Sequence, residues 1–134
     1  MKGYHSNIEQ DSIVNNNFRK VVYTGKHSQL VLMSLKPKED IGFEVHEEND
    51  QFFRCEQGQG ICIIDETEYQ ITDGSAIVVP AGANHNVVNT SETEDLKIYT
   101  IYSPAHHKDA IVRETKAEAE AEANEAEFDG VTSE

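Results

Sequence analysis

Cysteine is scarce: the chain has two among 134 residues. Two cysteines cannot build the disulfide framework of a small secreted protein, so we expect a reducing compartment, by default the cytoplasm. No apolar run is long enough to span a bilayer, and no basic segment followed by an apolar one marks a secretory signal. These absences argue against a membrane partner.

Basic residues are also few, with 11 Lys and Arg against 25 Asp and Glu, for a formal net charge of −14. Repulsion therefore disfavours a nucleic acid or an anionic membrane. Residues 113–134 carry eight acidic and two basic side chains, a net charge of −6, so the other 112 residues carry −8. The domain accepts a neutral or cationic ligand more easily than a polyanion, although a bound metal would reverse the local field.

Two catalytic frameworks are missing. No glycine-rich loop opens a helix, which excludes a phosphate cradle of that kind. No serine sits in a nucleophile elbow, which excludes that form of acyl transfer.

The middle of the chain reads as a series of short strands with Gly, Pro and Asp between them and no helical period. The apolar or alternating segments are 18–24, 29–35, 41–46, 51–56, 61–65, 68–71, 76–79, 84–89 and 96–102. We expect a hairpin at Gly58-Gln59-Gly60. This pattern predicts an all-β fold, an antiparallel sandwich or barrel, and a jelly roll would leave the fewest exposed edges.

The two ends differ from this domain, which we place at residues 18–112. Residues 1–17 are polar and are expected to form an irregular arm with at most one short strand. Residues 113–134 form an acidic Ala/Glu-rich tail. There Thr115 and Glu118 fit a capping box before a helix over 117–127. That helix has almost no apolar stripe, so we expect it to be solvated and to fray before 128–134.

One motif points to a family. Gly74, Pro80, Gly82, His85 and Asn89 have the spacing of a Gly, five residues, Pro, one residue, Gly, two residues, His, three residues and Asn. This spacing resembles the second conserved motif of the cupin superfamily, whose histidine is a metal ligand inside a small β-barrel. The resemblance implies a jelly-roll barrel and a metal site, but no particular reaction.

The first cupin motif has a weaker counterpart upstream. Counting back from Gly58 places Gln51 where cupins have Glu, Glu44 and His46 where they have His-x-His, and Lys38 where they have Gly. The resemblance therefore implies a site of Glu44, His46, Gln51 and His85.

Strand geometry supports the same residues. Glu44 and His46 share one face of a strand by period two, within reach of one cation. Two His and one carboxylate resemble the facial triad of non-haem Fe(II) sites, with Gln51 as a weak fourth oxygen ligand. These donors suit one divalent Fe, Mn, Ni, Co or Zn ion.

Alternatives remain open at this site. Ile41, Phe43 and Val45 could instead form the core face of that strand; otherwise they need a cover from a second sheet, the N-terminal segment or a dimer partner. Gln51 could hydrogen-bond a water instead of coordinating, and a metal-free, degenerate cupin is the competing interpretation of the whole site.

Other residues carry weaker signals. Glu47 and Glu48 are candidates for a general base, or simply solvated loop charges. Cys55 and Cys62 are expected to be buried free thiols, with a redox pair as the alternative. His106 and His107 are expected on a surface loop. Arg19, Lys20 and Arg54 could meet a ligand phosphate or carboxylate, but their spacing does not mark a site.

The chain is also similar to small single-domain bacterial cupins that are often described as mannose-6-phosphate isomerase-like, many of which are homodimers. We therefore expect a homodimeric, metal-dependent enzyme acting on a small oxygen-rich substrate, as a sugar isomerase or a dioxygenase. The alternative is a non-catalytic cupin that binds a small molecule or sugar, and a structural or storage role is a third interpretation.

Overall fold

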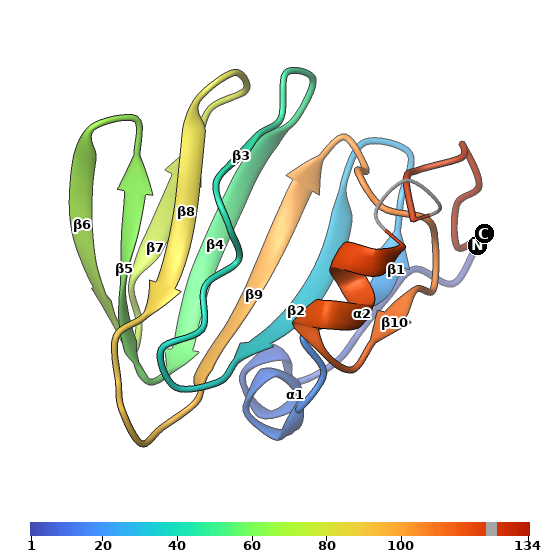
Figure 1. Ribbon diagram of the computed structural model, residues 1–134. Helices are drawn as coiled ribbons and strands as arrows, with labels where there is room; N and C mark the ends of the chain where they lie inside the picture. The colour runs from blue at the N-terminus through green and yellow to red at the C-terminus, as the bar shows by residue number, and fades with distance from the viewer. Residues whose placement is uncertain (123–125) are drawn as a thin grey trace.

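A computed structural model describes residues 1–122 and 126–134 of the chain (Figure 1). Two antiparallel sheets face each other, with strand orders β10-β1-β2-β9-β4-β7 and β3-β8-β5-β6. The strands are β1 (Arg19–Thr24), β2 (Gln29–Leu35), β3 (Glu44–Val45), β4 (Asp50–Gln57), β5 (Gln59–Ile64), β6 (Thr67–Thr72), β7 (Ala76–Val79), β8 (Asn84–Asn89), β9 (Leu96–Ser103) and β10 (Val112–Arg113). The helices are α1 (Ile8–Val14) and α2 (Lys116–Ala121). The predicted all-β jelly roll with a C-terminal helix is confirmed.

The core lies between the two sheets. Strand β2 is buried along almost its whole length, as its continuous apolar run predicts, because it lies between β1 and β9. Its apolar side chains join a single buried cluster with residues of β4, β5, β8 and β9, including Phe53, Cys62, Val87, Leu96 and Ile98. Burial of this apolar surface is the main force that holds the two sheets together.

The turn after β4 corrects the expected hairpin at Gly58-Gln59-Gly60. Strand β4 pairs with β7 and β9, whereas β5 pairs with β6 and β8, so the turn carries the chain from one sheet to the other. Gly58 has φ +101°, and a Cβ there would lie 2.6 Å from the carbonyl oxygen of Asp95. A Cβ at Gly60 would lie 2.2 Å from the carbonyl oxygen of Val88. Only glycine fits this crossing.

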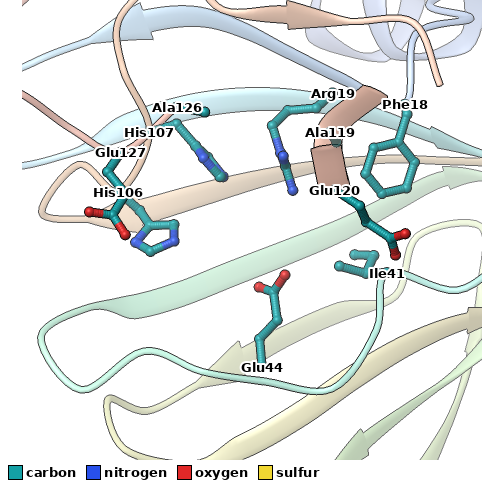
Figure 2. Close-up of a pocket in the computed structure, with 10 residues that line it drawn as sticks. All are labelled: Phe18, Arg19, Ile41, Glu44, His106, His107, Ala119, Glu120, Ala126 and Glu127. Atoms are coloured by element: carbon teal, nitrogen blue, oxygen red, sulfur yellow. The ribbon is translucent and has the colours of Figure 1, made fainter. Parts of the chain in front are cut away.

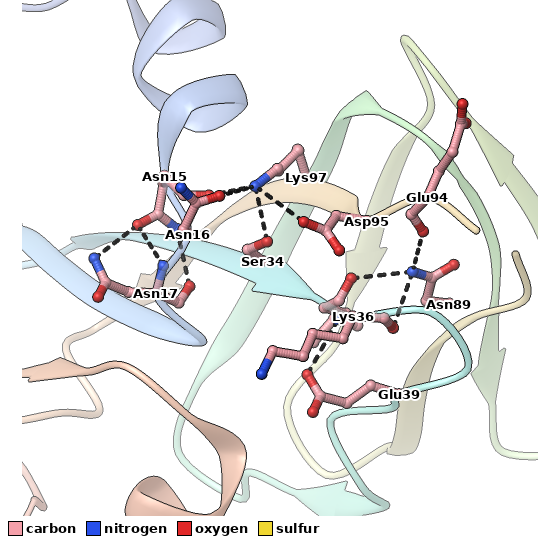
Figure 3. Close-up of polar contacts among 11 residues, drawn as sticks. Asn15, Asn16, Asn17, Ser34, Lys36, Glu39, Asn89, Glu94, Asp95 and Lys97 are labelled. Carbon is pink, nitrogen blue, oxygen red and sulfur yellow. Dashed lines mark hydrogen bonds and ion pairs between the residues drawn. The ribbon is translucent and has the colours of Figure 1, made fainter. Parts of the chain in front are cut away.

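The N-terminal arm contains a helix, so the expectation of an irregular segment is wrong. Asn7 caps α1 by accepting a hydrogen bond from the backbone N–H of Gln10 at 3.0 Å. Just after the helix, the buried Nζ of Lys97 donates to the carbonyl of Asn15 at 2.6 Å and to Oγ of Ser34 at 3.0 Å (Figure 3). The arm is thus fastened to β2 and β9. Its seven-residue helix buries only Ser12, which leaves little apolar pattern to read from the sequence.

Asn89, the last residue of the second motif, is a structural clamp. Its buried Nδ2 donates to the carbonyls of Leu35, Lys36 and Glu94 at 3.0, 3.0 and 2.8 Å (Figure 3). Its Oδ1 accepts from the N–H of Ser91 at 2.9 Å. One side chain therefore joins the loop after β2 to the loop between β8 and β9.

Most described residues of the tail are exposed, and its helix ends before 128–134, as expected, but a few residues pack against the domain. Thr115 caps α2 as predicted, accepting from the N–H of Glu118 at 3.2 Å. Ala119 and Ala126 are buried in the core cluster. Farther on, the N–H of Phe128 donates to the carbonyl of His106 at 3.0 Å. Small alanines can bury themselves without the wide apolar stripe that marks most packed helices.

The predicted helix over 117–127 begins with α2 in the structure, which ends at Ala121. Positions 123–125 of that prediction lie outside the described residues. Neither α1 nor α2, the helices of the described ranges, is long and apolar enough to cross a membrane.

Candidate metal centre and the adjoining cavity

Sheet register brings Glu44 and His85 together. They are directly paired partners where β3 meets β8, so their side chains lie side by side on the inner face of the smaller sheet. His46 follows β3 and is buried. Its Nε2 lies 2.9 Å from Oε2 of Glu44. One ligand atom from each of these three residues lies within 4.8 Å of the others.

The Nε2 atom of His46 has no hydrogen-bond partner among the described residues, because its close approach to Glu44 is not directed as a hydrogen bond. A buried polar atom without a partner is costly and calls for an explanation. A cation held between Glu44, His46 and His85 would use this nitrogen as a ligand.

The charge states of the cluster suit such a cation. Burial raises the pKa of Glu44, but the adjacent His46 imidazole and then the charge of Arg19 hold that pKa below its ordinary value. Burial lowers the pKa of His85, against the opposing effect of the Ala83 carbonyl. Near neutral pH the cluster therefore contains a carboxylate and, at His85, a neutral imidazole, which are the forms that bind metals.

Gln51 reaches the same cluster from the opposite sheet. It is buried on β4, and its Oε1 lies 3.0 Å from Nε2 of His85. Its Nε2 donates to Oγ1 of Thr100 at 3.0 Å, which holds the amide in place. The four residues that the sequence singled out are thus adjacent, and the centre spans both sheets.

The donor set fits a divalent transition metal. It consists of oxygen and imidazole nitrogen without thiolate, which suits Fe, Mn, Ni, Co or Zn. Because Cys55 and Cys62 are buried free thiols on strands of different sheets, they are separate from this set. Burial raises the pKa of each to about 11, so both stay protonated.

The competing register of the 41–46 segment is wrong for Phe43 and Val45, although Ile41 packs against the core. Phe43 and Val45 are 57% and 46% exposed, whereas Glu44 and His46 turn inward. Neither the second sheet nor the N-terminal arm covers Phe43 and Val45. Lys38, which replaces the usual motif glycine, has φ +65°, so the backbone keeps the left-handed conformation that glycine prefers.

A cavity of about 200 Å³ adjoins Glu44. Figure 2 shows Arg19 and Glu44 pointing toward each other from opposite walls, with His106 and His107 to one side and Phe18 and Ile41 to the other. Residues of the tail, including Ala119 and Ala126, complete the lining. The cavity is therefore closed partly by the barrel and partly by the packed tail.

His106 and His107 do not form the surface loop that was expected. His107 is buried, and its Nε2 lies 3.2 Å from the hydroxyl of Tyr102. The His106 ring lies 4.2 Å from that of His46, measured between centroids. Burial lowers the pKa of His106 to about 4 and lowers that of His107 as well, so both are neutral near pH 7.

Sequence reasoning noted Arg19 as able to meet a ligand phosphate or carboxylate, but it placed no site at Arg19, His106 or His107. Arg19 lies on β1, which the fold brings near the centre only through β2 and β9. Adjacent histidines were the one available signal. The base candidates Glu47 and Glu48 lie elsewhere: both are exposed and line an outer groove that also touches His46 and His106. Their role as a base stays a prediction.

The family can be decided from the whole domain. Residues 31–102 match the cupin domain family. This range contains strands β3 to β8 in full and most of β2 and β9. The chain belongs to the cupin family.

Relatives of this cupin agree. It is 49% identical to protein YrkC of Bacillus subtilis (strain 168) over 126 residues, covering 90% of this chain and 67% of that protein. It is also 49% identical to the uncharacterized protein L612 of Acanthamoeba polyphaga mimivirus over 107 residues, covering 78% and 67%. The crystal structure of BH2720 from Bacillus halodurans is similar with a TM-score of 0.87 and 40% identity, covering 90% of this chain and 95% of that one.

Proposed function

We propose that this cupin is a metal-dependent enzyme whose divalent transition metal is held by Glu44, His46 and His85, with Gln51 as a weaker fourth oxygen ligand. The observation that carries the proposal is the buried Nε2 of His46, which lacks a hydrogen-bond partner and lies among the ligand atoms of Glu44 and His85. Two His and one carboxylate leave coordination positions free for a substrate.

The substrate is a small oxygen-rich molecule. When bound, the metal would supply Lewis-acid chemistry for an oxygen of the substrate or, as Fe(II), would support chemistry with dioxygen. The residues of the chain would position that molecule: the cavity beside Glu44 offers polar groups at Arg19 and apolar walls at Phe18 and Ile41 that exclude water.

Dioxygenase-like chemistry has more support here than sugar isomerisation. An isomerase needs a base that moves a proton between adjacent carbons. The candidates Glu47 and Glu48 are exposed in the outer groove, not among the residues that line the cavity beside Glu44. The apolar part of the cavity wall suits a reaction that must exclude water. Membership of the mannose-6-phosphate isomerase-like group remains the alternative within the same proposal.

The test is the metal content of protein purified without a metal-affinity tag, measured by mass spectrometry. We expect near-stoichiometric transition metal in the wild type and loss in Glu44→Ala and His85→Ala. Glu66→Ala and His27→Ala are matched controls, since both residues are exposed and far from the cluster along the chain. Oxygen consumption with the Fe(II)-loaded protein then separates dioxygenase from isomerase.

Absence of metal, together with no uptake of offered Fe(II), Mn(II), Ni(II), Co(II) or Zn(II), would contradict the proposal. The protein would then be a non-catalytic cupin that binds a small molecule. Metal retained in both Ala variants would place the ion elsewhere on the chain.

A further inference from the structure

Arg19 is a buried cation at the cavity wall. It is 7% exposed and is the first residue of β1. Its guanidinium carbon lies 5.4 Å from the ring centroid of Phe18. Figure 2 shows its guanidinium pointing into the space in front of Glu44. The side chain therefore presents a fixed positive charge to whatever enters the cavity.

This charge has no counter-ion in the described part of the chain. No described carboxylate oxygen lies within 4.0 Å of the Arg19 guanidinium, and its buried Nε has no hydrogen-bond acceptor. Glu44 is close enough to feel the charge but does not pair with it. Because burying an unpaired charge is costly, such an arrangement is typical of a group that is paired by a ligand.

From this arrangement we infer that the cavity binds a small carboxylate, whose acid group is held by Arg19 and whose other end points toward Glu44, His46 and His85. The inference deepens the proposed function, on which it rests, by naming the substrate class. A guanidinium offers two parallel N–H donors that match the two oxygens of a carboxylate.

The charges around Arg19 favour a carboxylate over a phosphate. The other acidic residues that line the cavity are Glu44, Glu120 and Glu127. One guanidinium balances one negative charge. A phosphate dianion would keep an excess charge next to three carboxylates, in a protein whose net charge is already −14.

The remaining walls suggest a short hydrocarbon part. Phe18, Ile41, Ala119 and Ala126 supply apolar surface to the cavity that contains Arg19 and Glu44. A volume of about 200 Å³ limits the ligand to a small molecule. A short carboxylic acid with a further oxygen would place one polar end at each site.

The experiment compares carboxylates with their neutral amides by NMR titration of the full-length protein. The pairs are acetate with acetamide, lactate with lactamide and benzoate with benzamide, and inorganic phosphate is a further probe. We expect at least one acid to bind about tenfold or more tightly than its amide, as a charge-assisted pair allows. A nonspecific effect would favour the amides, because the protein is strongly acidic.

Two variants assign the preference to Arg19. Arg19→Gln should lose the preference for the acid over its amide. Arg19→Lys should keep only part of that preference, since lysine lacks the two parallel N–H donors of the guanidinium. Lys20→Gln is the matched control: it removes the same charge from the next residue of β1, where the side chain is exposed, and should keep the preference.

The inference is overturned if no acid is preferred over its amide in the wild type, if Arg19→Gln keeps the preference, or if phosphate binds more tightly than every acid. Metal content measured on the same samples separates this from the proposed function. Metal without acid preference removes only the substrate class, whereas acid preference through Arg19 without metal removes only the metalloenzyme.

Discussion

Oε1 of Gln51 lies 3.0 Å from Nε2 of His85, although the two residues come from opposite sheets. Nδ1 of the same imidazole lies 3.1 Å from the Ala83 carbonyl, which can only accept, so the single proton of the neutral ring sits on Nδ1. Nε2 and Oε1 then face each other as two acceptors. Either a cation joins them, or the Gln51 amide is rotated and donates to His85.

Gln51→Glu separates these two states. With a metal in the centre, the added carboxylate is a stronger ligand, so we expect the affinity for Mn(II) or Fe(II) to rise about tenfold or more, equivalent to ~1.4 kcal/mol. Without metal, the variant should unfold at a lower temperature than the wild type, because it buries an additional charge. Chelator competition and thermal unfolding measure both effects. Unchanged metal affinity would show that Gln51 does not coordinate.

Asn89→Ala should destabilise the protein by about 2–4 kcal/mol, because the carbonyls of Leu35, Lys36 and Glu94 and the N–H of Ser91 lose their partner. Denaturant unfolding measures the loss. Asn84→Ala on the same strand is the matched control, since Asn84 is exposed, and it should change stability by less than ~0.5 kcal/mol. Equal effects at the two positions would contradict the clamp.

Acid should release the tail through Asp40. The Lys116 ammonium, 2.6 Å away, and then the Asn86 amide hold the pKa of Asp40 below its ordinary value, against the opposing effect of burial. At a pH above the ordinary pKa of Asp, the ionised Asp40 stabilises the docked tail. This stabilisation is lost as the pH falls through the lowered pKa of Asp40. We expect the NMR signals of Ala119 to shift over that range before the core signal of Ile98.

Asp40→Asn is the control for this titration. It removes the ionisable group but keeps the shape of the side chain, so the tail signals should lose their pH dependence over the same range. An unchanged acid transition in this variant would mean that another group releases the tail.

Homodimer formation stays a prediction, and the exposed edge of the smaller sheet is where it can be tested. Strand β3 lies at that edge, and Phe43 beside it is 57% exposed. Exposed apolar edges are typical places for pairing with another chain. We expect a dimer by light scattering that Phe43→Ser weakens, whereas Val78→Ser, at an apolar position on β7 that is 65% exposed, leaves it intact. A monomeric wild type would contradict this.

The sequence predicted the interior of this fold better than its ends. Alternation and turn residues marked the strands, because a two-sheet core imposes period two and buried runs. At Gly58, glycine permits both a hairpin and a crossing between sheets, and the choice depends on distant partners such as Asp95. The arm and the tail gain their order from contacts made by Lys97, Ala119 and Ala126, which carry no local signal.

The same division applies to the centre. The sequence alone could identify the four residues of the centre, because they follow fixed spacings along the chain: Glu44, His46, Gln51 and His85. Arg19 could not, because it reaches the cavity from β1 across three-dimensional packing. His106 and His107 were visible as a pair, but their burial depends on the tail that folds over them.

Lys38 shows which property of the first motif is retained. A lysine holds φ +65° there, and its N–H donates to the carbonyl of Ser91 at 3.1 Å. The backbone torsion angle is therefore kept although the residue type has changed, at some energetic cost. Searches that demand glycine at this position would reject chains of this kind, and searches phrased in backbone angles would retain them.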